Sequence, residues 1–237
     1  MRNPKWWSLA ALLTGLAVIA ITGVFMSLHL RTVQPLGGAY GDQAMIAFEL
    51  ADTPEKLARV IGTDPPSAGT AQVRREMDSA NHIDFLYIAV YTPFIACSCA
   101  ALALRRRRRW LWLGVALAPL AALCDVAENL ALLALTRSGA DVPALLAALH
   151  LRTFAKWELL ALSSALFAAG FVGGGRHLLS TVAALIALAA LGAGVLTFVD
   201  AAAYSPLLLD AIVVVWLWQL GYAALALFMP TLMHRTA

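Results

Sequence analysis

Charged residues are scarce in this chain. Of its 237 residues only 13% are Asp, Glu, Lys or Arg, whereas a water-soluble domain contains about a quarter. Hydrophobic residues make up 61% of the sequence, and the mean hydropathy is +0.77. This balance excludes an ordinary soluble globular domain and predicts an integral membrane protein.

Cysteines and signature motifs are also few. The three cysteines, Cys97, Cys99 and Cys124, all lie within long apolar stretches, so the sequence predicts no disulfide framework. It contains no Walker, Rossmann, zinc-ribbon, CDP-alcohol or paired histidine (His-x-x-x-His) motif. We therefore expect no cofactor, and the enzyme classes that those motifs define are excluded.

Long apolar stretches are what the sequence has in abundance. A spanning helix needs about 20 apolar residues to cross roughly 30 Å of hydrocarbon, and lipid offers its backbone no hydrogen-bond partner outside the helix. The sequence therefore predicts an all-α transmembrane helix bundle, a single membrane domain over residues 1–237. Six stretches are long enough to span, at residues 7–28, 82–104, 110–135, 153–172, 178–199 and 207–233.

The distribution of basic residues predicts the orientation of the bundle. Five consecutive arginines, residues 105–109, separate the second and third spans, and such runs mark the cytoplasmic side. They could instead bind anionic lipid, but the topological role suffices and we expect no nucleic-acid partner. The first span follows Arg2 and Lys5 and lacks a small-x-small cleavage site, which predicts an uncleaved signal anchor. Both termini are then cytoplasmic, and the segments outside are 29–81, 136–152 and 200–206.

The segment 29–81 is the longest piece outside the predicted spans. Residues 41–62 have apolar positions at helical spacing, and Thr53-Pro54 is typical of a helix start. Residues 64–69 are expected to form a turn, and 71–79 another short helix. About fifty residues cannot bury a core of their own. We therefore expect a small helical extracytoplasmic cap on the outer mouth of the bundle.

Ionisable residues inside spans are costly, so each one is a functional-site hypothesis. In the third span Asp125, Glu128 and Asn129 have the spacing i, i+3, i+4 and share one helix face. A face with two carboxylates and a carboxamide cannot point at lipid. It should face the interior, where Lys156 is the only available ammonium partner.

The second span carries a matching polar stripe at i, i+3 and i+7. At 1.5 Å per residue its three members lie about 3, 8 and 13 Å below the outer boundary. Asp125 and Glu128, roughly 22 and 27 Å from the inner boundary by the same rise, lie at a similar depth. The predicted site therefore consists of Asp84, Tyr87, Tyr91, Asp125, Glu128, Asn129 and Lys156.

Several chemistries are compatible with this site. Adjacent buried carboxylates are shared by proton carriers, general acid/base pairs and metal sites. A polar clamp that only fixes helix register is the structural alternative. Asp210 and Gln219 are second-tier candidates, and His82 and His150 could add metal ligands, although no two histidines share a helix face.

The pattern resembles a group of uncharacterised bacterial polytopic membrane proteins. It consists of Phe48-Glu49-Leu50-Ala51 with Thr53-Pro54-Glu55, then Asp84-Phe85-Leu86-Tyr87 with Tyr91, then Asp125-Val126-Ala127-Glu128-Asn129, then Lys156. The resemblance covers about residues 45–160. Where an aromatic would follow the first motif, this chain has Ile61-Gly62-Thr63. The resemblance implies a bacterial cytoplasmic (inner) membrane location and one shared unit of polar residues, and it carries no assigned activity.

These observations lead to three hypotheses. The first is a protein whose outward-facing polar pocket binds or transports a small or amphipathic, lipid-like ligand. The second is an outer-leaflet enzyme in which the carboxylates act as acid and base or hold a metal, and Lys156 holds a phosphate. The third is a structural subunit of a membrane complex. The expected partners are membrane lipids, the ligand, and either a membrane-protein partner or further copies of the chain.

Overall fold

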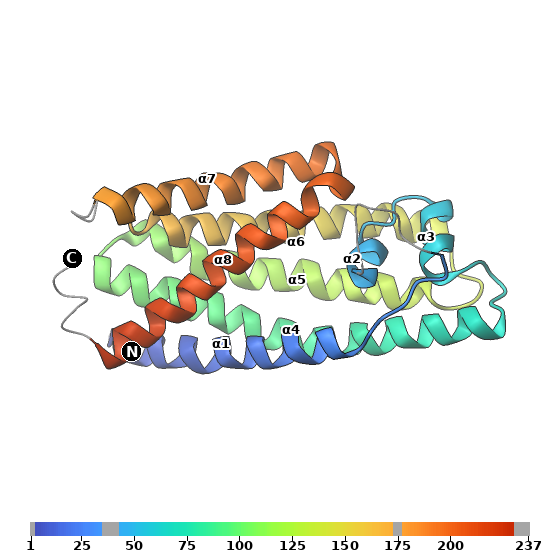
Figure 1. Cartoon of the computed structure of the whole chain (residues 1–237), viewed down its shortest axis with the longest axis horizontal. Coiled ribbons are helices and arrows are strands. Elements are labelled where there is room, and N and C mark those ends of the chain that lie inside the picture. Colours follow the sequence, from blue (N-terminus) through green and yellow to red (C-terminus); the bar gives the residue numbers. More distant parts are fainter. Residues whose placement is uncertain (1–2, 35–42, 173–176, 230–237) are drawn as a thin grey trace. The chain divides into compact units, whose positions relative to one another are not determined.

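The computed structural model describes residues 3–34, 43–172 and 177–229. Within these ranges every regular element is a helix (Figure 1), which confirms the predicted all-α class. The elements are α1 Pro4–Ser27, α2 Ala44–Glu49, α3 Pro54–Ile61, α4 Ala68–Arg106, the short 3₁₀-helix η1 Arg109–Leu111, α5 Trp112–Leu135, α6 Val142–Ala169, α7 His177–Val199 and α8 Ala201–Phe228.

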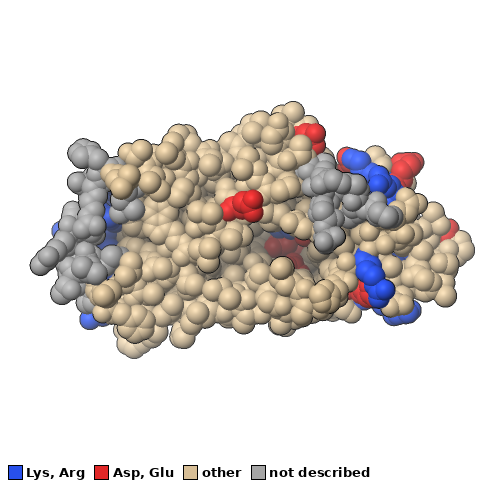
Figure 2. Space-filling view, viewed as in Figure 1, with Lys and Arg blue, Asp and Glu red and all other residues tan. Residues whose placement is uncertain are grey.

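Four of the described helices are long and apolar enough to cross a membrane: α1, α4, α5 together with η1, and α8. Large apolar side chains such as Leu123 and Leu217 are exposed on them, as a lipid-facing surface requires. On the face shown in Figure 2 most of the surface carries neither basic nor acidic side chains. The length, composition and exposed apolar surface of these helices therefore indicate a membrane protein.

The two remaining predicted spans are less apolar or shorter. Helix α6 carries Arg152, Lys156 and Glu158, which interrupt its apolar run. The apolar part of α7, Thr181–Thr197, is shorter than the four long spans.

Helix boundaries differ from the predicted ones in two places. The expected short helix 71–79 and the second span are one continuous helix, α4, of 39 residues. Helix α6 begins at Val142, eleven residues before the predicted start of the fourth span, and Asp141 caps it by accepting a hydrogen bond from the backbone N–H of Ala144 at 3.3 Å. Both helices therefore extend beyond the hydrophobic stretches that identified them.

The chain forms two compact units, described separately. The first unit contains residues Met1–Ile19, Ala89–Ala122 and Trp157–Ala237. Within it α7 packs along α8 (Figure 1), and the aromatic rings of Phe171, Trp218 and Tyr222 pack together.

The second unit contains Ala20–Ile88 and Leu123–Lys156. Its core joins α2 and α3 to the helices beside them, because Phe48 and Ile61 are fully buried with Met77 of α4 and Leu132 of α5. The described part of the segment 29–81 therefore shares its core with the neighbouring helices, as its length predicted. Helix α3 begins as expected: Thr53 accepts a hydrogen bond from the N–H of Lys56 at 3.2 Å, and Pro54 takes the first helical position.

Candidate functional site

The second unit gathers three carboxylates around the ammonium group of Lys156. The Lys156 Nζ atom donates to Glu128 Oε1 at 2.7 Å and to Glu49 Oε2 at 2.9 Å, and it lies 3.4 Å from Asp125 Oδ1. Only 4% of the Lys156 surface is exposed. We name these four residues the Lys156 cluster. A lysine ammonium has three N–H donors, and here three carboxylates surround it.

Helix α5 supplies two members of the cluster from one face, as the i, i+3 spacing predicted. Asp125 and Glu128 are both buried. The following residue, Asn129, donates from Nδ2 to Asp84 Oδ2 at 2.7 Å and so connects α5 to α4. Within the described part of the chain, Glu128 Oε2 and Asn129 Oδ1 have no hydrogen-bond partner.

Glu49 was not among the predicted site residues. It is the last residue of α2 and is 7% exposed, and its backbone carbonyl accepts a hydrogen bond from Thr153 Oγ1 at 3.3 Å. Its neighbours Phe48 and Leu50 are buried as well. A single acidic residue within an apolar run of the predicted cap was the signal that could have identified it, because such a residue needs a buried partner.

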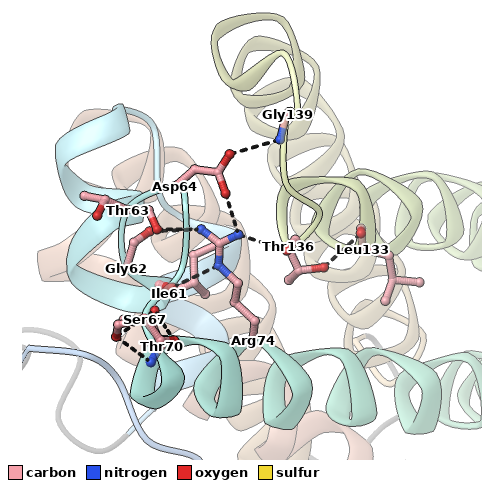
Figure 3. A network of polar contacts seen from close by, with 10 residues as sticks. All are labelled: Ile61, Gly62, Thr63, Asp64, Ser67, Thr70, Arg74, Leu133, Thr136 and Gly139. Atoms are coloured by element: carbon pink, nitrogen blue, oxygen red, sulfur yellow. Dashed lines mark hydrogen bonds and ion pairs between the residues drawn. The ribbon is translucent and has the colours of Figure 1, made fainter.

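A second polar network fixes the end of α3 against α4 and α5 (Figure 3). The buried guanidinium of Arg74 on α4 donates to the carbonyls of Ile61 at 3.2 Å, Gly62 at 3.4 Å and Thr63 at 3.1 Å. It also donates to the carbonyl of Thr136, after α5, at 3.1 Å. Gly62 turns the chain with φ of +80°, which glycine adopts without strain. One side chain therefore holds three segments together.

Asp64 extends this network to the turn between α5 and α6. Its carboxylate accepts a hydrogen bond from the N–H of Gly139 at 3.0 Å and lies 3.5 Å from Arg74 Nη1. The Gly139 N–H, helped by the Ser138 side chain and by Arg74, lowers the pKa of Asp64 below its ordinary value of 3.8. The carboxylate is therefore charged at neutral pH and links the two turns.

A cavity of about 220 Å³ lies beside this network. Its wall is mainly apolar, with Leu57, Leu135 and Val142 among the lining residues, and the charged groups at its edge are Asp64, Arg74 and Arg137. None of its lining residues belongs to the Lys156 cluster. Its shape and lining indicate no chemistry.

The two predicted tyrosines have different surroundings. Tyr87 is half-buried, with its hydroxyl 3.5 Å from Thr22 Oγ1 and its ring packed edge-on against Phe25. Tyr91 lies in the first unit, where its ring packs against Trp216 at 5.8 Å between centroids. Tyr91 therefore takes part in aromatic packing in the first unit.

The second-tier residues also lie in the first unit. Gln219 is fully buried, and in the described chain neither of its amide atoms has a hydrogen-bond partner, whereas Asp210 is exposed. The predicted metal candidates are both exposed. His82 Nδ1 lies 2.6 Å from the carbonyl of Asp78, and His150 packs against Phe154. Among the described residues no three His, Cys, Asp or Glu side chains are arranged to hold a metal ion.

The charges of the site do not balance. In the described chain Glu49, Asp125 and Glu128 contact a single ammonium, and Asp84 is bound to the neutral Asn129. Buried carboxylates without a counter-charge must take up protons or bind a cation. The arrangement can therefore exchange protons or cations, while Lys156 donates hydrogen bonds to Glu49 and Glu128. Comparison of the chain with family models, with curated proteins and with solved structures gave no match.

Proposed function

We propose that this chain is a six-span protein of the bacterial cytoplasmic membrane that binds a small or amphipathic ligand at the Lys156 cluster. Binding serves transport, with Asp125 and Glu128 as the protonatable pair. The observation that carries the proposal is the convergence of these two carboxylates on Lys156 in a buried position. Inside a membrane such groups are costly and mark ligand or ion pathways.

The six spans of the proposal are the four long apolar helices together with α6 and α7. The five arginines 105–109 lie at the end of α4, which makes that end cytoplasmic by the positive-inside rule. The segment containing α2 and α3 then lies outside, at the opposite end of α4. In this orientation the Lys156 cluster is in the outer half of the bilayer, and ligand reaches it from the outside.

Binding explains the polar contacts better than a structural clamp does. A clamp that only fixes helix register should have every buried polar group paired, because an unpaired group costs free energy in a low dielectric. Here Glu128 Oε2 and Asn129 Oδ1 have no donor in the described part of the chain. A hydrolase that holds a phosphate on Lys156 is not supported, because three carboxylates already surround its Nζ atom.

Mass spectrometry of co-purified compounds tests the proposal. The full chain is purified in mild detergent, and small molecules and lipids that it retains are extracted and quantified for the wild type, Glu128→Gln and Glu158→Gln. Glu158 is the matched control because it lies on α6 but outside the cluster. We expect the wild type and the Glu158→Gln control to retain about one molecule of a compound per chain, and Glu128→Gln to retain at least tenfold less of it. Equal retention by all three, or no retained compound, would leave only the structural clamp.

A further inference from the structure

The excess of acid in the site restricts what can bind there. The titratable groups that face it are Glu49 from α2, Asp84 and Tyr87 from α4, Asp125 and Glu128 from α5, and Lys156 from α6. Arg152 of α6 donates instead to the carbonyl of Ala127. With every carboxylate ionised, these described groups sum to three negative charges. A buried site cannot hold that charge without protons or a bound cation.

The unpaired atoms of the site are acceptors. Glu128 is fully buried and Asn129 is 1% exposed, and one oxygen of each has no donor in the described chain. A phosphate or a carboxylate would bring only further acceptors and negative charge. An ammonium group brings three donors, a positive charge and no acceptor, so it supplies what both oxygens lack.

A bare metal ion fits less well than an ammonium group. The described carboxylates are not arranged as a metal-binding set. The point on which Glu49, Asp125 and Glu128 converge is already taken by the Lys156 ammonium. The chain thus shows in its own structure that these carboxylates accept an alkylammonium group, at 2.7 to 2.9 Å from two of them.

We propose that the ligand recognised at the Lys156 cluster carries a primary ammonium group, which binds between Glu128 and the Asp84–Asn129 pair and replaces protons there. This inference rests on the proposed function and names its ligand class. In the empty site the surplus carboxylates hold protons. When the ammonium binds, a carboxyl O–H gives its proton to water and the carboxylate that remains pairs with the ligand, so no covalent bond of the ligand changes. Binding therefore tightens as the pH rises.

Melting temperatures with simple probes test the charge of the ligand. The full chain in detergent is titrated with n-butylammonium chloride, and with sodium butyrate and sodium chloride at equal ionic strength, at pH 6 and pH 8. We expect a saturable rise with n-butylammonium alone, at least tenfold tighter at pH 8, absent in Glu128→Gln and retained in Glu158→Gln. A rise with butyrate, equal rises with the ammonium and sodium salts, or tighter binding at pH 6 would each overturn the inference.

The wild-type probe series keeps the inference testable even if Glu128→Gln does not fold. Nanodiscs separate the two sources of an ammonium group: phosphatidylethanolamine should compete with n-butylammonium if the ligand is a lipid headgroup, and phosphatidylglycerol nanodiscs should leave the probe response intact. Competition by neither lipid points to a free amine. A co-purified compound that is neutral or anionic would leave the proposed function standing and overturn this inference alone.

Discussion

In the described part of the chain, the ammonium group of Lys156 contacts three buried carboxylates. Removing one partner of a buried ion pair leaves uncompensated charge and typically costs about 3–5 kcal/mol. We therefore predict that Lys156→Met lowers the free energy of unfolding by about that amount, measured by chemical unfolding in detergent.

Lys56→Met is the control for this substitution. Lys56 pairs with Asp52 at 2.8 Å, but both side chains are largely exposed. An exposed pair contributes about 0–1 kcal/mol. Similar losses in the two variants would show that the Lys156 cluster is hydrated and that its carboxylates do not depend on the buried ammonium.

For single residues, the sequence predicted the part of the site whose members are close together along one helix. Asp125, Glu128 and Asn129 share a face because they are within one turn, and Lys156 was the only cation available to them. Glu49 escaped prediction because it is separated from Lys156 by 107 residues, and no periodicity relates α2 to α6. Tyr91, at i+7, lies about 10 Å along the helix from Asp84, where its ring packs against Trp216, and its place in the site stays a prediction.

Among the elements, α3 is positioned by one buried arginine rather than by an independent core. Arg74 donates to four backbone carbonyls, and bonds to a charged donor contribute about 1.5–3 kcal/mol each. We predict that Arg74→Gln loosens α2 and α3, so that their amides exchange with deuterium at least tenfold faster in hydrogen-exchange mass spectrometry. Because Glu49 ends α2, the variant should also weaken the contact with Lys156.

Arg75→Gln provides the matched comparison, because Arg75 is the next residue of α4 and its side chain is exposed. It should leave the exchange of α2 and α3 unchanged. If Arg74→Gln behaves like Arg75→Gln, the apolar core around Phe48 and Ile61 positions these helices without the arginine.

Asp64 links the turn after α3 to the turn between α5 and α6, and this link makes part of the free energy of unfolding depend on pH. The folded state lowers the pKa of Asp64 below 3.8, mainly through the N–H of Gly139. A lowered pKa gives stability that is present above the unfolded value and is lost as the pH falls through the folded one. Asp64→Asn should therefore be less stable than the wild type at pH 7, and the difference should shrink below about pH 4. An unfolding series from pH 7 to pH 3 that shows a constant difference would contradict this role.

The helix boundaries show where hydrophobic periodicity stops being informative. It located the apolar parts of α4 and α6, but not their polar extensions. A helix continues beyond its apolar part where its residues allow helical geometry and tertiary packing stabilises it. The N-terminal half of α4 is polar and still helical, since Met77 and Arg74 pack there against α3 and α5. The cap of α3 at Thr53, in contrast, depends only on local residues and was predicted correctly.

At the scale of the whole molecule, composition alone identified a membrane protein. The formal net charge of +3 conceals an uneven distribution of basic and acidic residues along the chain. Under the proposed orientation, nine of the 17 basic residues and none of the 14 acidic residues lie on the cytoplasmic side. The acidic chemistry of the Lys156 cluster then belongs to the outer half of the bilayer, so the proposed function depends directly on the orientation.

Cysteine labelling tests that orientation. With Cys97, Cys99 and Cys124 replaced by alanine, a single cysteine is introduced at Ser67 or at Arg107, both of which are exposed beside opposite ends of α4. A membrane-impermeant maleimide should label Ser67→Cys in sealed spheroplasts, and Arg107→Cys only after the membrane is opened. The positive-inside rule requires this order, because the five arginines resist translocation. The reverse labelling would place the Lys156 cluster on the cytoplasmic half, and ligand would then have to reach it from inside the cell.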